Sequence, residues 1–384
     1  MFSSDEYISR RSRLLARMQD EKLDALVIFA SKIASGHVRY YAGYESQLGI
    51  LDCSCLIVIP GAKHEWTLVT NAFWDEPFGI PGLNHVIVTG DFAKTVGQLL
   101  RSHKGSVGVA PYKYFPAPVF CAIAESESPV AIRDVTELLL SLRAVKSKEE
   151  IEVLRQVAAI ADRAGEAFLS TTRAGVSERD IAAEVEYSLR RAGSGPFVFS
   201  TILFSGPQTA GFIGLPGTRK LAEGDLVQLD CGPSLEGYQG DFARALCVGE
   251  PDSQATAMLE TNALMYEQCL AALRPGTLAC EVAEKVLGFA KREGFDDTNF
   301  YQSPNVKPGL VGHGIGLGNP DVPQLSTEDE TVLAEGMVVN IETILRISGR
   351  GGTRIEDAAV LTKDGATRLS SCPIRLWQTE ASNA

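Results

Sequence analysis

The chain has 384 residues, of which 45% are apolar and 22% charged, and its formal net charge is −12. This length exceeds what one hydrophobic core usually organises, so we expect two domains. The negative charge argues against nucleic acid or an anionic membrane as a partner. There is no apolar run long enough for a signal peptide or a membrane span, and the eight cysteines contain no Cys-x-x-Cys pair. A cytoplasmic protein with free thiols is therefore expected.

The first 140 or so residues alternate segments typical of strands and helices. A helix with one polar face is predicted over 5–22, and an apolar strand follows at 24–30. Two strands, 53–59 and 65–71, flank a Pro-Gly turn and are predicted to form a hairpin. A strand, a helix, a strand and a helix are then predicted at 85–90, 92–103, 106–110 and 117–126. The pattern predicts an α/β domain over residues 1–143.

A helix-start pattern marks the beginning of a second domain. Ser147 followed by Glu150 is a capping box, in which the hydroxyl and the carboxylate satisfy free helix N–H groups. Apolar residues then recur at helical spacing. We therefore place the second domain at 147–384.

The second domain contains a duplicated pattern. Residues 173–193 align without gaps on 274–294, with six identical pairs, and the phrase Leu-Ala-Glu-Gly follows each copy, at 221–224 and 333–336. Each copy of this phrase leads into an apolar run that ends on an acid. The repeated order of helix and strand predicts a domain built from two similar halves.

Four carboxylates occupy matched positions in this duplicated frame. Asp230 and Glu342 end the two apolar runs, and Asp241 and Glu356 are expected at the start of the following strands. Their neighbours are apolar, so the acids should be buried. Buried carboxylates that lie close together repel one another unless cations balance them.

Two explanations compete for these acids. They could cap turns or pair with Arg244 and Arg354 at the surface. This explanation is adequate for any one acid, but it does not explain four acids at matched positions. His313, in a glycine-rich segment between the halves, adds a candidate ligand. One imidazole with four carboxylates and no thiolate favours Mn²⁺, with Co²⁺, Fe²⁺ and Zn²⁺ as alternatives. Four acids suit two divalent metal ions, which would lower the pKa of a shared water.

The motifs resemble the pita-bread metallopeptidase family, M24, and in particular its prolidase, aminopeptidase P and creatinase branch. The resemblance lies in LVQLDCG with a second Asp eleven residues on, VGHGIGLG, NIET, GGTRIEDAAVLT, RAVKSKEEI and HVRYYAGY. It implies a mixed α/β (α+β) protein, with a creatinase-like N-terminal domain followed by a pita-bread domain of two pseudo-symmetric halves. By resemblance the metal ligands are Asp230, Asp241, His313, Glu342 and Glu356. Asp241 and Glu356 would bridge both ions, and Glu342 and His313 would be catalytic, with Glu342 as a proton shuttle.

The sequence departs from the family where the substrate is expected to bind. Family peptidases carry a histidine ahead of the first ligand strand, and the matching position here is about Ile213. They carry a His-Glu pair after the HGIGL segment, where this chain has Pro320 and Asp321. Such donors stabilise the reacting oxygen, and losing one typically costs about 10²–10³ in rate. The departure suggests that peptide recognition has been lost or rebuilt.

Other residues would then contact the substrate. Candidates are Arg354 and, from the first domain, His37, Arg39 and Tyr41; in this branch the first domain can reach a neighbouring subunit's site, which implies a homodimer. For each of the last three the alternative is that HVRYYAGY is a loop entering a strand.

Four functions remain open. The first is a two-metal hydrolase that cleaves a C–N bond of a small amino-acid-like molecule, and the second is an Xaa-Pro dipeptidase or aminopeptidase with a variant pocket. A lyase resembling dimethylsulfoniopropionate lyase and a catalytically inactive binding protein are further alternatives. An intact ligand set argues against the inactive protein, because buried acids without metal destabilise a fold.

Overall fold

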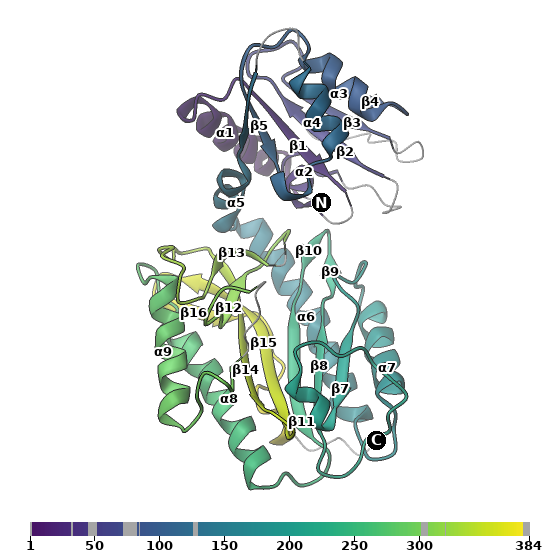
Figure 1. Ribbon diagram of the computed structural model, residues 1–384, viewed down its shortest axis with the longest axis vertical. Helices are drawn as coiled ribbons and strands as arrows, with labels where there is room; N and C mark the ends of the chain where they lie inside the picture. The colour runs from purple at the N-terminus through teal and green to yellow at the C-terminus, as the bar shows by residue number, and fades with distance from the viewer. Residues whose placement is uncertain are drawn as a thin grey trace. The chain divides into compact units, whose positions relative to one another are not determined.

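The protein is described here from a computed structural model, which covers residues 2–31, 34–44, 52–71, 83, 85–125, 130–300, 306–318 and 320–378. The chain divides into two compact units, Met1–Arg143 and Ala144–Ala384, and each is described by itself (Figure 1). Among the described residues there is no helix long and apolar enough to cross a membrane.

The N-terminal unit is an α/β domain around one mixed sheet, with strand order β4-β3-β2-β1-β5-β6. The strands are β1 Ala25–Ala30, β2 Ser54–Val58, β3 Trp66–Thr70, β4 Val86–Val88, β5 Gly105–Ala110 and β6 Val130–Asp134. The helices are α1 Ser4–Asp20, α2 Gly36–Ala42, α3 Phe92–Leu100, α4 Ala117–Ala124, α5 Thr136–Ala144 and the 3₁₀ turn η1 Tyr112–Tyr114. The predicted hairpin is confirmed, because β2 and β3 pair antiparallel.

The segment HVRYYAGY is neither a loop nor the start of a strand. It forms helix α2, which ends at Gly43 in the left-handed conformation with φ +63°. Glycine takes this conformation without steric cost, so the helix stops there. The helical repeat in this short segment was too brief to be recognised from the sequence.

The second unit is built on an eight-stranded sheet with the order β13-β12-β14-β15-β11-β8-β7, and β16 pairs with β15. Its strands are β7 Ile202–Ser205, β8 Leu226–Cys231, β11 Phe242–Cys247, β12 Gly312–Gly314, β13 Asp321–Gln324, β14 Val338–Ile347, β15 Gly351–Thr362 and β16 Gly365–Arg368. A short hairpin, β9 Ser234–Leu235 and β10 Tyr238–Gln239, lies outside this sheet. The helices are α6 Lys148–Thr171, α7 Glu178–Arg191, α8 Ser253–Ala272, α9 Ala279–Arg292 and the 3₁₀ turns η2 Gly206–Ala210 and η3 Leu376–Gln378.

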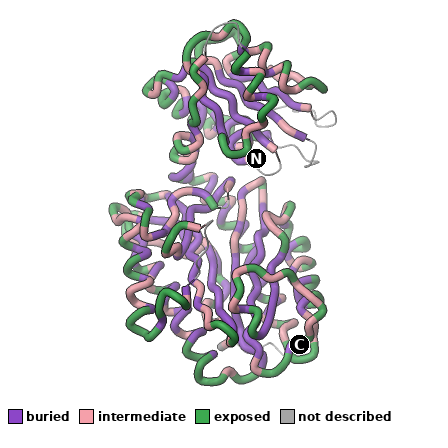
Figure 2. Tube along the Cα trace, viewed as in Figure 1, coloured by how far each residue is buried: buried purple, intermediate pink, exposed green. Residues whose placement is uncertain are grey.

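Two helix pairs cover one face of this sheet and leave the other face to the site. Leu229 on β8 packs with the core of α6 and α7, and Ile341 and Ile355 pack with that of α8 and α9. Successive side chains of a strand point to opposite faces. Asp230, Glu342 and Glu356, each next to one of these residues, therefore project from the face that the helices do not cover. Figure 2 shows how completely the central strands are buried.

The duplicated frame is present in the structure as two helix-and-strand units. Each Leu-Ala-Glu-Gly phrase forms the turn before a ligand strand, with Gly224 before β8 and Gly336 before β14 at φ +82° and +84°. The predicted capping box of Ser147 and Glu150 is formed at the start of α6. One detail of the prediction is wrong: Asp241 immediately precedes β11, but Glu356 lies in the middle of β15, because β15 starts at Gly351.

Candidate metal centre

Three of the predicted ligands lie in one row across the sheet. Asp230 is paired with Ala243, Ala243 with Glu356, and Glu356 with Glu342, on four adjacent strands. Paired residues of neighbouring strands project to the same face. The three carboxylates therefore share one face, with a methyl group between Asp230 and Glu356, and Asp241 lies two residues before Ala243 at the entry to β11.

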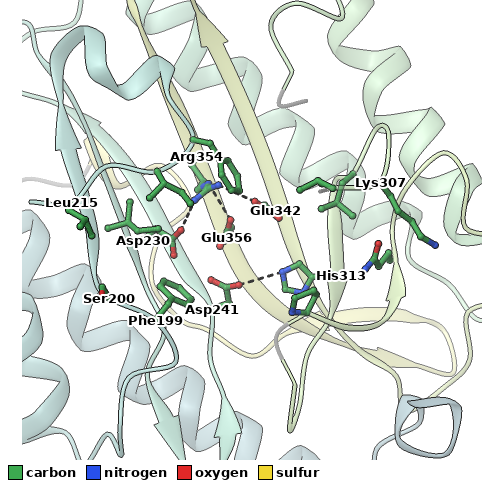
Figure 3. A pocket seen from close by; sticks show the side chains of 17 residues that line it. Phe199, Ser200, Leu215, Asp230, Asp241, Lys307, His313, Glu342, Arg354 and Glu356 are labelled. Atoms are coloured by element: carbon green, nitrogen blue, oxygen red, sulfur yellow. Dashed lines mark hydrogen bonds and ion pairs between the residues drawn. The ribbon is translucent and has the colours of Figure 1, made fainter. Parts of the chain in front are cut away.

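These side chains open into a cavity of about 410 Å³ (Figure 3). The volume falls within the range of small-molecule sites, about 300–1,000 Å³. One wall is acidic and contains the five predicted ligands, and most of the remainder is apolar. The described lining residues are Phe199, Ser200, Ile202, Phe212, Ile213, Leu215, Asp230, Asp241, Val306, Lys307, Leu310, His313, Pro320, Gln324, Glu342, Arg354 and Glu356.

The geometry of the acids fits a divalent metal centre. Asp230, Asp241 and Glu356 each offer a carboxylate oxygen within 4.8 Å of the other two. Oδ1 of Asp230 and Oε2 of Glu356 are buried and have no hydrogen-bond partner among the residues described. Buried acceptors normally have partners, so these two oxygens are available to a bound cation.

Arg354 balances part of this charge inside the site. Its guanidinium lies 2.5 Å from Asp230 Oδ2, 3.2 Å from Glu342 Oε1 and 3.3 Å from Glu356 Oε1, and it stacks over the Phe212 ring at 4.3 Å. The alternative of surface pairing is wrong here, because the Arg354 side chain is only 3% exposed. Arg354 does not offset the acids completely: burial, and then the neighbouring carboxylates, raise the pKa of Glu356 well above its ordinary value.

His313 faces the acids from β12. Its Nδ1 donates to the carbonyl of Gly314 at 2.9 Å, so Nε2 is the ring nitrogen that faces the acids, and it lies 3.4 Å from Asp241 Oδ2. Burial lowers the pKa of His313, but the hydrogen bond and charge of Asp241 outweigh it and raise the pKa to about 9. A Cβ on Gly314 would collide with the carbonyl of Val322, so glycine at this position allows β13 to approach the backbone beside His313 closely.

The structure brings some of the predicted substrate residues to the cavity. Ile213, Pro320 and Arg354 line it, whereas Asp321 is not among the described lining residues, and its Oδ1 accepts from the Val322 N–H at 3.0 Å.

The three candidates from the N-terminal unit lie on α2. His37 is buried and its Nδ1 accepts from Arg143 Nη1 at 3.0 Å, which gives this histidine a structural role in its own unit. Arg39 and Tyr41 follow on the same helix, and Tyr41 is fully buried with a hydroxyl that has no partner among the described residues.

Sequence reasoning missed most of the cavity lining other than the acids. Phe199, Phe212, Lys307 and Gln324 all line the cavity. They come from loops and from the end of β13, far apart in the chain, and no spacing or repeat connects them. Their role follows from the fold alone.

Comparison with known proteins identifies the family. The profile of metallopeptidase family M24 matches residues 152–363, more than half of the chain. The chain belongs to metallopeptidase family M24. The M24 match contains all five predicted ligands, so the resemblance seen in the sequence is confirmed and the protein is a metal-dependent hydrolase of the Xaa-Pro peptidase type.

Two curated relatives match much of the chain. An Xaa-Pro dipeptidase of Pyrococcus furiosus is 33% identical over 64% of this chain and 68% of its own length. An Xaa-Pro dipeptidase of Pyrococcus horikoshii is 32% identical over 62% of this chain and 66% of its own length. These matches thus span about two thirds of the length of each of these relatives.

Two solved prolidase structures match nearly the whole chain. The prolidase of Pyrococcus furiosus aligns with a TM-score of 0.79 and 28% identity, over 95% of this chain and 99% of that one. The prolidase of Pyrococcus horikoshii aligns with a TM-score of 0.84 and 25% identity, over 95% and 99%. The predicted two-domain pita-bread architecture is therefore confirmed.

Proposed function

We propose that Asp230, Asp241, His313, Glu342 and Glu356 together hold two divalent metal ions, with Mn²⁺ as the preferred ion. Support comes from the unpartnered oxygens of Asp230 and Glu356 and from a donor set of four carboxylates and one imidazole. Two such ions, when bound, supply a hydroxide near neutral pH and polarise the carbonyl under attack.

The chain's own residues would do the rest of the chemistry. Glu342 lines the cavity and is 8% exposed, and Arg354 Nη2 lies 3.2 Å from its Oε1. We propose that Glu342 carries a proton to the leaving nitrogen, with Arg354 orienting the carboxylate. The acidic wall attracts the ammonium group of a substrate, and the apolar wall around Phe199 and Phe212 accommodates an apolar side chain and excludes water.

We propose that the reaction is the hydrolysis of a dipeptide of the Xaa-Pro type. The observation that carries this proposal is the convergence of the five ligand side chains on one cavity of dipeptide size. The curated relatives that cover about two thirds of this chain are Xaa-Pro dipeptidases, which supports the same substrate class.

A second candidate is the hydrolysis of a C–N bond in a small non-peptide substrate. It is favoured by Ile213 and Pro320, which line the cavity where the family peptidases carry imidazole donors. An apolar rim suits a substrate that needs less hydrogen bonding than a peptide does.

A substrate panel with the Mn²⁺-loaded enzyme separates the two. The panel contains Xaa-Pro dipeptides, the same dipeptides with alanine in place of proline, longer Xaa-Pro peptides, creatine and ectoine, and the metal-stripped protein is the control. Metal-dependent turnover of the Xaa-Pro dipeptides is expected. Turnover of creatine or ectoine without peptide cleavage would support the second candidate, and no metal-dependent turnover of any compound would contradict both.

We further propose a cytoplasmic homodimer in which Arg39 of one subunit reaches the site of the other, whereas Tyr41 is buried within its own unit. Light scattering would then give about twice the chain mass of 41.3 kDa. Mixed dimers of an Arg39→Ala chain and an Asp241→Asn chain test the shared site. If Arg39 acts in its own subunit only, these mixed dimers should show no intact site.

A further inference from the structure

The two halves of the catalytic unit meet where β11 runs beside β15. The two strands are aligned at one register pair, Ala243 opposite Glu356. Asp241 lies two residues before this pair, and Glu356 is part of it. The separation of β11 and β15 at this seam therefore sets how far the carboxylates of one half lie from those of the other.

Arg244 crosses the seam on the face opposite the acids. It is fully buried, with 0% exposure. Its Nη1 donates to the carbonyl of Ala243 on β11 and to the carbonyl of Glu356 on β15, both at 2.8 Å. One nitrogen thus joins the two strands at the residues that are paired across the seam.

The remaining donors of this guanidinium are also used. Nη2 donates to Asp357 Oδ2 at 2.6 Å and to the carbonyl of Cys372 at 3.1 Å, and Nε donates to the carbonyl of Pro373 at 2.9 Å. Five N–H groups make five bonds, so the planar group is held in one orientation. Asp357 is in turn held by Arg368 at 2.8 Å and by the Tyr266 hydroxyl.

Stability alone does not account for this arrangement. A buried ion pair is weak evidence for stability, since well-packed apolar side chains of similar size often stabilise a fold as well. An apolar side chain cannot, however, bind two carbonyl groups on two strands. The property that requires arginine at this position is its rigid fork of donors.

We infer that Arg244 is a positioning residue for the metal centre: it holds β11 and β15 at the separation that lets Asp241 and Glu356 bind the same pair of ions. The inference rests on the proposed two-metal site. Residues that orient metal ligands typically change metal affinity by about 10–100-fold when they are replaced.

Arg244→Lys tests the inference, with Arg368→Lys as the matched control. Lysine keeps a positive charge near Asp357 but lacks the fork that spans both carbonyls. Arg368 shares two partners with Arg244, Asp357 Oδ2 and the Cys372 carbonyl at 2.6 Å, and neither is a backbone group of the seam. Each protein is titrated with Mn²⁺, and bound ions are counted by elemental analysis and by the magnetic coupling between the ions in electron paramagnetic resonance.

The wild-type protein and Arg368→Lys are expected to bind two coupled ions. Arg244→Lys is expected to bind the second ion at least tenfold more weakly, and its electron paramagnetic resonance spectrum should show uncoupled ions. Its circular dichroism spectrum should be that of the folded protein. Two coupled ions of unchanged affinity in Arg244→Lys, or equal losses in both variants, would overturn the inference. A wild-type protein that binds no Mn²⁺ would instead overturn the metal-centre proposal on which the inference rests.

A milder pair of variants decides the question if Arg244→Lys does not fold. Asp357→Asn removes the charge that orients Arg244, whereas Tyr266→Phe removes another contact of the same carboxylate that does not involve Arg244. Asp357→Asn should weaken the binding of the second Mn²⁺ ion, and Tyr266→Phe should leave it unchanged. Equal effects of the two substitutions would contradict a role for Arg244.

Discussion

Glu342 and Glu356 face each other directly across the β14–β15 hairpin, on the side of the sheet that forms the cavity. Like charges directly opposite each other destabilise a pair of strands. Arg354, two residues before Glu356 on the same face, contacts both carboxylates. In the protein without metal, this guanidinium is the counter-charge of Asp230, Glu342 and Glu356, since His313 faces Asp241 and Lys307 is paired with Asp329 at 3.6 Å.

Replacing Arg354 with methionine should therefore destabilise the metal-free protein. Removing one partner of a buried ion pair leaves uncompensated charge, and about 3–5 kcal/mol of unfolding free energy is the usual loss. Mn²⁺ should restore much of this loss, because the ions replace the missing cation. Urea unfolding of Arg354→Met and of the wild type, each with a chelator and with Mn²⁺, measures both effects.

Arg350→Met is the control for this prediction. Arg350 lies in the same hairpin but pairs with the exposed Asp252 at 2.5 Å, and surface substitutions usually change stability by less than about 0.5 kcal/mol. If Mn²⁺ stabilises Arg354→Met no more than it stabilises the wild type, Arg354 and the metal do not balance the same carboxylates.

Asp241→Asn should remove metal binding and activity together. The amide has the same shape but lacks the charge, and Asp241 is one of the three acids whose oxygens lie within 4.8 Å of one another. Metal affinity should fall by at least the roughly 10–100-fold that replacing an outer-shell partner costs. Elemental analysis after gel filtration gives the metal content, and the Xaa-Pro panel gives the activity.

Asp225→Asn provides the comparison for this substitution. Asp225 lies in the same half but is bound in the turn before β8, where Arg219 donates to it at 2.6 and 2.9 Å. This variant should lose stability and keep its metal. Full activity of Asp241→Asn at normal metal content would show that Asp241 is not a ligand.

The sequence was sufficient for those parts of the site that depend on local pattern or on duplication. The duplicated pattern predicted that Asp230 and Glu342 lie on two similar strands. The structure contains these strands as β8 and β14. The position of Glu356 within β15 was misjudged, because that strand is longer than its counterpart β11 and duplication does not fix strand length. Arg354 was a candidate substrate contact and does line the cavity, but its contacts with three carboxylates depend on the folded sheet and could not be read from the sequence.

The small side chain of Ala243 is predicted to be necessary for metal binding. Ala243 lies in the row between Asp230 and Glu356, and its methyl group points to the same face as their carboxylates. A larger side chain would extend between the two acids. Ala243→Leu should therefore lower Mn²⁺ affinity strongly. Ala243→Ser, which adds one atom, should retain the metal, and equal metal content in both variants would exclude steric control at this position.

Ile213→His should increase the hydrolysis of Xaa-Pro dipeptides. Ile213 is 64% exposed and lines the cavity, so an imidazole at this position has room to turn toward the substrate. Donors that stabilise the reacting oxygen are typically worth about 10²–10³ in rate when they are well placed. Since the new donor is not oriented by neighbouring groups, we expect a smaller gain of roughly tenfold in kcat/KM.

Leu215→His places the same imidazole two residues further along, at a position that also lines the cavity and is 67% exposed. It controls for a general effect of added polarity, and it should leave kcat/KM for Xaa-Pro dipeptides within about twofold of the wild type. An equal gain in both variants would show that position 213 has no special relation to the reacting oxygen. A loss of dipeptide hydrolysis in Ile213→His alone would show that the apolar side chain itself contributes to substrate binding. The imidazole would then disrupt a contact that the isoleucine makes with the substrate.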